Sequence, residues 1–188
     1  MARFPAVVVA LSVACGSAFV AGQARVTQEG RAIVKFRRPE VTAVASYEYS
    51  QRTHDGAWLL IEFAVQAAER IAIDRNEISL QGPGESRVVP VATQEQFLED
   101  HEELNKLLQN AVVTRRPLAN FFTTRPQPTI RFFSRPGGIV HDSAATNLDE
   151  VAAGDLLFKA PDGRWPAGSY RLRLNHAKAK AELPLELK

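Results

Sequence analysis

The sequence predicts a mainly β protein with one inserted α-helix at about residues 94–112. Three observations lead to this prediction. Apolar and polar residues alternate through much of the chain, turn-forming residues separate the alternating segments, and helical spacing dominates one central segment. Several short strands in a chain of 188 residues with 11 Gly and 11 Pro are typical of a β-sandwich or a barrel.

The N-terminus has the pattern of a secretory signal peptide. Arg3 is the only charged residue in this segment, and an apolar run over residues 4–13 is followed by small residues. Cleavage after Ala24 fits best, because signal peptidase accepts small side chains just before its cut. We therefore expect a signal peptide over residues 1–24 and one exported domain over residues 25–188, in the periplasm or outside the cell.

Two alternatives to cleavage use the same segment. The uncharged residues 4–24 are long enough to cross a bilayer as an uncleaved anchor. Lipidation of Cys15 is the other alternative, although Ser12 stands where a lipobox prefers Leu. We expect membrane contact only through an uncleaved leader or a lipidated Cys15. Since Cys15 is the only cysteine, the cleaved chain would have neither a disulfide nor a thiolate metal site.

Alternating apolar residues predict short strands in the first half of the exported domain. Turn-rich segments at residues 74–76 and 81–84 separate some of them. The expected apolar faces run from Val41 to Tyr49, Leu59 to Val65, Ile71 to Ile73, Ile78 to Leu80 and Val89 to Val91.

A single helix interrupts these strands. Thr93 and Gln96 match a capping box, in which each side chain bonds the backbone N–H of the other residue. Apolar positions and one histidine then recur at helical spacing: Phe97, His101, Leu104, Leu107, Leu108 and Val112. Pro117 follows the expected end. We expect the helix at about residues 94–112 to pack across the sheet.

The C-terminal third returns to strands. Residues 130–133 and 156–158 are short apolar segments, and residues 170–174 and 181–187 alternate as a terminal hairpin would. Pro184 lies in the last of these segments and has no N–H to donate. We therefore expect the last strand to be an edge strand or to contain a bulge.

The segment from Trp165 to Leu174 carries a resemblance to a known family. Its run Pro166-Ala167-Gly168-Ser169-Tyr170 resembles the Pro-x-Gly-x-Tyr start of a late strand in bacterial exported immunoglobulin-like sandwiches, including the periplasmic copper-resistance type. A glycine permits a tight turn there, and the tyrosine then enters the core. The resemblance covers this segment alone and implies an immunoglobulin-like β-sandwich. It does not extend to copper ligands, because Met1 is the only methionine.

The sequence shows no motif for a catalytic, cofactor-binding or metal site. It contains neither a phosphate-binding glycine loop nor a nucleophile elbow. The pairs His54-Asp55 and His141-Asp142 are interpreted as loop residues. A formal net charge of +2 lacks the cationic excess that nucleic-acid binding needs. We expect no cofactor, no metal and no nucleic-acid partner.

The feature that points to a function is apolar surface. Trp58 and Leu60 alternate with the residues of the same strand that are expected to face the core. Two large apolar side chains seldom lie together on a strand face that is exposed to solvent. Phe133 alternates with Arg131 and Arg135, and this aromatic and arginine composition is enriched at protein interfaces. We predict that these five residues form an interaction patch if their face is uncovered. The alternative is that the helix or a later loop covers it.

The sequence therefore favours an exported, noncatalytic binding or structural module of a bacterial envelope or the extracellular space. Its partner would be another envelope protein or a second copy of the chain. Two other functions stay open: an exported hydrolase with an unrecognised carboxylate or His-Asp site, and a small-ligand carrier. A concave pocket with convergent polar groups would favour these, whereas a flat patch with aromatic anchors favours a partner module.

Overall fold

The computed structural model describes residues 23–54, 56–83 and 87–188. The expected signal peptide, apart from its last two residues, and Cys15 lie outside the described residues. Within these ranges, no helix is both long enough and apolar enough to span a membrane.

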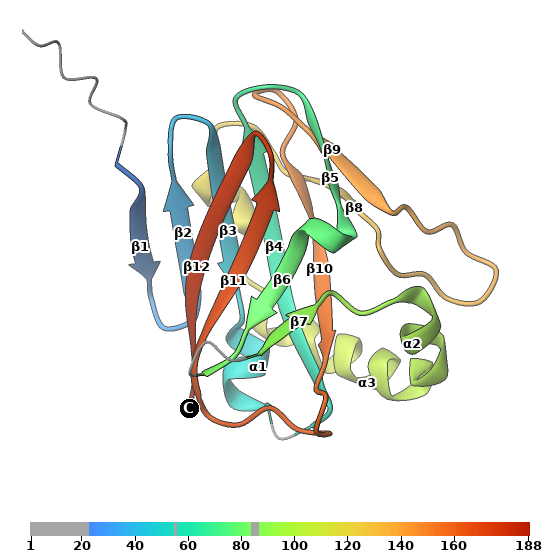
Figure 1. Ribbon diagram of the computed structural model, residues 1–188. Coiled ribbons are helices and arrows are strands. Elements are labelled where there is room, and N and C mark those ends of the chain that lie inside the picture. The colour runs from blue at the N-terminus through green and yellow to red at the C-terminus, as the bar shows by residue number, and fades with distance from the viewer. Residues whose placement is uncertain (1–22, 55, 84–86) are drawn as a thin grey trace, which may run out of the picture.

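Strands dominate the structure and form two large sheets and one small sheet (Figure 1). In order across the six-stranded sheet lie β1 (Arg25–Glu29), β2 (Ile33–Arg37), β3 (Val41–Ser46), β4 (Trp58–Ala67), β10 (Ala152–Lys159) and β8 (Gln127–Ile130). The four-stranded sheet has the order β12 (Ala179–Leu187), β11 (Gly168–His176), β6 (Ile78–Gln81) and β7 (Val88–Pro90). β5 (Ile71–Asp74) pairs with β9 (Ser143–Thr146). The prediction of a mainly β chain is confirmed.

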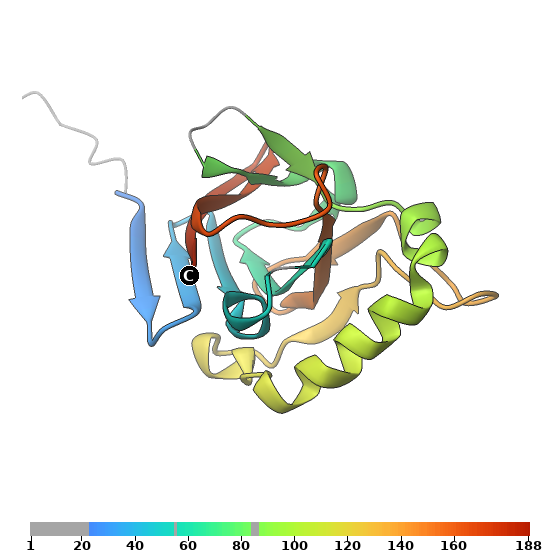
Figure 2. The ribbon, with the colours of Figure 1, turned by 90° about the horizontal axis from the view of Figure 1, so that it is seen from below.

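The main core lies between the two large sheets (Figure 2). Alternate residues of a strand share one face, and on β4 the inward face consists of Leu59, Ile61, Phe63 and Val65, all fully buried. Leucines of β11 and β12 belong to the same buried cluster. This packing of two sheets on a common core is consistent with a β-sandwich.

The outer face of β4 is buried as well. Trp58 and Leu60 pack against the helical layer, and Ala64 packs beneath the 3-10 helix Leu118–Phe121. A strand buried on both faces needs apolar residues at nearly every position. This explains why β4 reads as an almost continuous apolar run, with Glu62 as its only charged residue.

The predicted helix is present in two pieces, α2 (Gln94–Glu99) and α3 (His101–Ala111). The capping box is confirmed, because Thr93 Oγ1 accepts from the Gln96 N–H at 3.2 Å and Gln96 Oε1 accepts from the Thr93 N–H at 2.9 Å. The expectation of one continuous helix is wrong. Asp100 breaks it with φ −108° and ψ 22°, and its carboxylate binds Trp58 Nε1 at 3.0 Å and Lys159 Nζ at 2.8 Å.

Two strands end earlier than predicted. β3 stops at Ser46, and the short helix α1 (Glu48–Arg52) replaces the expected strand as far as Tyr49. The Ser50 hydroxyl explains the change, because it donates to the Leu60 carbonyl and accepts from the Leu60 N–H, each at 2.8 Å, which fixes α1 on β4. Likewise β8 ends at Ile130, where a strand was expected to begin.

The terminal hairpin is confirmed as β11 and β12. β12 is an edge strand, as Pro184 predicts. Gly168 has φ +148°, a conformation that favours glycine, and Tyr170 enters the core with 2% of its surface exposed. The Tyr170 hydroxyl donates to the Pro166 carbonyl at 2.7 Å, which ties the start of β11 to the preceding loop.

Candidate functional site

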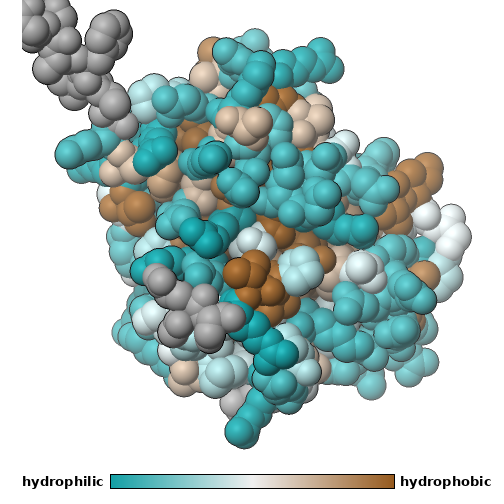
Figure 3. Space-filling model, viewed as in Figure 1, coloured by the Kyte–Doolittle hydropathy of each residue, from teal (hydrophilic) through white to brown (hydrophobic). Residues whose placement is uncertain are grey.

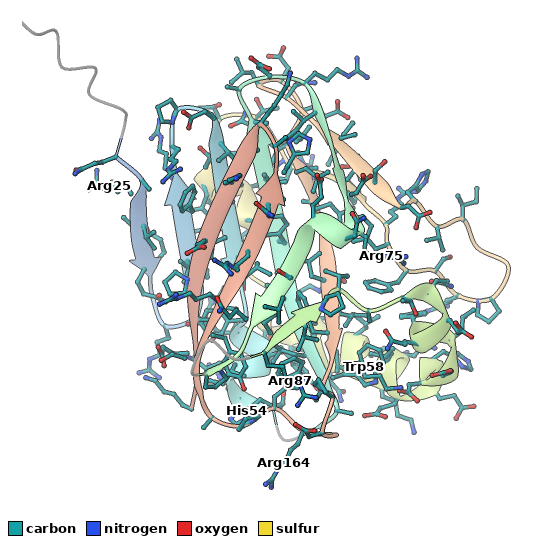
Figure 4. The ribbon with its side chains drawn as sticks, in the orientation of Figure 1. Arg25, His54, Trp58, Arg75, Arg87 and Arg164 are labelled. Atoms are coloured by element: carbon teal, nitrogen blue, oxygen red, sulfur yellow. The ribbon has the colours of Figure 1, made fainter. Side chains whose placement is uncertain are left out.

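The predicted interaction patch does not exist as one uncovered surface. Trp58 and Leu60 are each only 2% exposed, and they lie in a buried cluster with Phe97, Leu104 and Leu157 of the helical layer and β10. Figure 4 shows Trp58 beside α2 and α3. The alternative given by the sequence, a face covered by the helix, is therefore the observed arrangement. The expectation of a five-residue patch is wrong, because two of its members belong to the core.

The other three predicted residues lie together in a groove between α3 and the segment 128–135. We call it the α3–β8 groove, and its volume is about 610 Å³. Arg131, Phe133 and Arg135 all line it. Phe133 is half-buried, and its ring stacks on that of Phe97 with 5.5 Å between centroids. The hollow is bounded on its other side by α3, which runs alongside β8 in Figure 2.

One face of α3 forms the first wall of this groove. Asn105, Leu108 and Gln109 of α3, with Val112 directly after its end, occupy positions i, i+3, i+4 and i+7, which lie on one side of a helix. The Gln94 side chain fixes the far wall: its amide donates to the Ser134 carbonyl at 2.7 Å and accepts from the Ser134 N–H at 3.0 Å. Gln94 is not itself a lining residue, so this wall of the groove is held from behind through Ser134.

The floor of the groove is formed by β10, where β8 approaches very closely at Gly154. A Cβ atom at Gly154 would collide with the carbonyl oxygen of Ile130. A glycine is therefore needed for β8 to pair with β10 in this register. Leu157 provides the apolar part of the floor and Asp155 its charged part.

A second hollow of about 490 Å³ adjoins the groove. We call it the Glu62 pocket. Glu62 on β4 lies directly opposite Asp155 on β10 in the antiparallel register, so two carboxylates share the outer face of the sheet. Arg115 Nη2 binds Asp155 Oδ2 at 2.7 Å, and Arg115 Nε lies 4.0 Å from Glu62 Oε1. Arg115 and Asp155 line both hollows and mark the boundary between them.

Among the residues that the structure describes, Glu62 has the titratable side chain with the largest pKa shift. Burial raises the pKa of its carboxyl from 4.5 to about 7; the Arg115 guanidinium opposes the rise, and the Asp155 carboxylate adds to it. Its side chain is only 13% exposed. Burial therefore keeps the Glu62 carboxyl protonated to a higher pH than an exposed glutamate.

Arginines and exposed apolar side chains surround the two hollows. Arg116 and Arg125 line the Glu62 pocket, and Arg131 and Arg135 line the α3–β8 groove. None of these four forms an ion pair with a carboxylate in the described part of the chain. Val112, at the end of α3, is 61% exposed. The combined site is an apolar trough with a basic rim.

The histidines do not contribute to this site. The ring nitrogens of His54 lie 2.9 Å from the Trp165 carbonyl and 2.7 Å from the Lys188 carbonyl. Asp142, beside His141, pairs instead with Arg75 at 3.5 Å, and Figure 4 shows Arg75 well away from His54. Residues 23–54, 56–83 and 87–188 hold no group of three His, Cys, Asp or Glu side chains suited to a metal ion.

Sequence reasoning missed the cluster of Glu62, Asp155 and Arg115. One signal was present, because a lone Glu in an apolar strand marks either a partner or a perturbed group. No local pattern connects Glu62 to Asp155, since only the pairing of β4 with β10 brings them together. Comparison of the chain with protein-family models, with curated proteins and with solved structures gives no match.

Proposed function

We propose that this protein is an exported, noncatalytic binding module whose α3–β8 groove takes an extended, acidic and apolar peptide segment of another envelope protein. The observation that supports this proposal is an apolar groove rimmed by arginines without ion pairs. The apolar lining favours a ligand whose apolar side chains become buried in the groove. The arginines can bind carboxylates on the same ligand.

Apolar contact supplies the affinity in this proposal. Leu108, Val112, Ile130 and Phe133 line the groove from both walls. Phe133 is held in place by its stacking on Phe97, so little side-chain entropy is lost when a ligand covers it. A partly buried, fixed aromatic ring is the type of residue that anchors interfaces.

The arginines supply the selectivity for acidic ligands. Arg131 and Arg135 stand at the groove, and Arg116 and Arg125 continue the positive rim over the Glu62 pocket. Asp155 is neutralised by Arg115 at 2.7 Å, so it does not cancel this rim. Complementary charge speeds encounter with an acidic ligand and disfavours basic ones.

The ligand is held by side-chain contacts rather than by extending the sheet at β8. Pro128 lies within the short edge strand β8 and has no N–H. A strand that pairs with a sheet edge needs regular backbone donors along it. An extended segment lying in the groove across β8 and β10 avoids this requirement.

Peptide selection and titration test the proposed groove. A displayed library of peptides of about twelve residues, roughly 40 Å when extended, is selected on the wild-type chain. We expect the selected peptides to combine Asp or Glu with apolar anchors. In fluorescence anisotropy, the double variant Arg131→Glu, Arg135→Glu should weaken their binding at least about tenfold, or about 1.4 kcal/mol. Arg164→Glu, an exposed change distant from the groove, should leave binding unchanged (Figure 4).

Equal binding of the selected peptides to the wild type and the double variant would overturn the groove proposal. Selection of neutral or basic peptides would do the same.

The immunoglobulin-like architecture is the finer part of the proposal. Tyr170 near the start of β11 bonds the backbone four residues upstream, which is how the tyrosine corner of immunoglobulin domains is built. One feature departs from that family: β1 to β4 follow each other as neighbours in a single sheet, whereas immunoglobulin strands alternate between sheets earlier. The proposal therefore rests on Tyr170 and the two packed sheets.

Export is proposed from the leader pattern over residues 1–24. Intact-mass analysis of the chain recovered from cell envelope or medium should give an N-terminus at Arg25. A chain that retains residue 1 in the membrane fraction would support the uncleaved anchor instead. A lipid mass on Cys15 would support the lipoprotein.

A second candidate function is the hydrolase, which the Glu62 pocket favours. A group with a pKa near 7 beside a carboxylate held by Arg115 resembles the unequal acid pairs used for general acid–base catalysis. It ranks second because the carboxylates are already engaged with Arg115, and the described residues offer no metal site. Mass spectrometry of the peptides after incubation separates the functions: cleavage by the wild type but not by Glu62→Gln would favour the hydrolase.

A further inference from the structure

β1 forms one outer edge of the six-stranded sheet. It pairs with β2 on one side and with no described strand on the other. Four of its five residues are exposed. Figures 1 and 2 both show β1 at the margin of the molecule, away from α3 and its groove. The backbone donors and acceptors along its outer side are therefore open to another strand.

The other three edge strands of the two large sheets carry a proline. β8 contains Pro128, β12 contains Pro184 and β7 ends at Pro90. A proline removes a donor and discourages pairing between molecules at an exposed edge. β1 has no proline, and its pairing with β2 is regular from Arg25 to Glu29 without a bulge. The proline that discourages pairing between molecules at the other three edges is therefore absent from β1.

The sequence of β1 is complementary to itself when two copies run antiparallel. With Thr27 opposite the Thr27 of a second copy, Arg25 lies opposite Glu29, and the two-fold symmetry repeats this pair. Opposite charges and paired threonines at directly facing positions stabilise antiparallel strands. Val26 and Thr27 are also residue types favoured in strands.

We infer that β1 pairs antiparallel with β1 of a second copy and joins two six-stranded sheets into one continuous sheet. Val26 is 45% exposed, and Figure 3 shows an apolar area over β1 at the left margin. Arg25 points away from the body of the molecule in Figure 4, where it is free to meet a second chain. The contact is short, so the dimer is weak and depends on concentration.

The inference goes beyond the peptide-binding proposal and does not depend on it. The dimer would leave the α3–β8 groove of each copy open, because β1 and α3 lie on different sides of the molecule (Figures 1 and 2). Two open grooves on one particle would raise the apparent affinity for a partner that presents repeated segments.

Sedimentation velocity at low ionic strength tests the inference, with the chain that begins at Arg25 as the proposed export would leave it. The wild type should form a dimer as its concentration rises towards the millimolar range. Arg25→Glu and Glu29→Arg should each weaken the dimer about tenfold or more, because each change places like charges opposite one another twice. An equimolar mixture of the two variants should dimerise again, since one copy then presents two acids and the other presents two bases.

Two controls keep the charge test specific. Thr27→Pro should abolish the dimer whatever the charges, because a proline in the middle of a five-residue strand disrupts regular backbone pairing. Circular dichroism should be unchanged in the charge variants, whose side chains are exposed. A wild type that stays monomeric at millimolar concentration would overturn the inference. Failure of the mixture to restore the dimer would overturn it as well.

Discussion

Trp58→Ala is expected to lower the free energy of unfolding by about 3–5 kcal/mol. Trp58 is 2% exposed and lies in the cluster that joins β4 to α2 and α3. Its truncation leaves a cavity, and it also removes the Nε1–H donor to Asp100 at 3.0 Å. Urea denaturation followed by circular dichroism measures the change.

Two further variants separate the loss of the hydrogen bond to Asp100 from the loss of buried volume and provide an exposed control. Trp58→Phe keeps most of the ring but loses the bond to Asp100, so we expect a smaller loss of about 1–3 kcal/mol. Val113→Ala lies in the same helical region but is 88% exposed, and it should change stability by less than about 0.5 kcal/mol. A loss below about 1 kcal/mol for Trp58→Ala would contradict the burial of this residue.

Glu62→Gln is expected to stabilise the protein at pH 8 by roughly 3 kcal/mol at most. The pKa of Glu62 rises from 4.5 in the unfolded chain to about 7 in the folded protein, and each unit is worth about 1.36 kcal/mol. Between these values the folded state binds more protons than the unfolded state. Wild-type stability should therefore fall as the pH rises from 4.5 to 7 and change little from this group at higher pH.

Stability curves at pH 4.5, 6, 7 and 8 measure this dependence. The difference between Glu62→Gln and the wild type should be smallest at pH 4.5, where Glu62 is protonated in the folded protein. Glu95→Gln, an exposed acid on α2, serves as the matched control and should not alter the slope. If Glu62→Gln and the wild type keep the same slope, Glu62 does not titrate in this range.

Most of the central strands could be predicted because their apolar alternation is strong and their turns are marked. β4, β6 and the terminal hairpin are examples. β9 could not be predicted, because its sequence Ser-Ala-Ala-Thr has no apolar alternation and its extended form depends on pairing with β5. β1 and β2 were missed since they are short and their charged residues interrupt the pattern.

The site was harder to predict because it depends on which sheet face is covered. The alternation in β4 separates Trp58 and Leu60 from the main core, but it does not say that α2 and α3 return to cover them. Arg131, Phe133 and Arg135 were predicted as site residues because aromatic and arginine residues alternate locally, and the structure places all three in one groove. The pairing of Glu62 with Asp155 depends on the register of β4 and β10, which no short segment encodes.

The burial of β4 on both faces has a consequence for the unfolded chain. Until α3 and β10 have been synthesised and have packed against it, the segment Trp58–Ala67 is exposed. An apolar segment with high β-propensity of this kind can start aggregation. Its single charge, Glu62, is ionised in the unfolded chain at neutral pH, and a charge inside such a run acts as a gatekeeper against self-association. The carboxylate that costs stability in the folded protein therefore protects the chain before it folds.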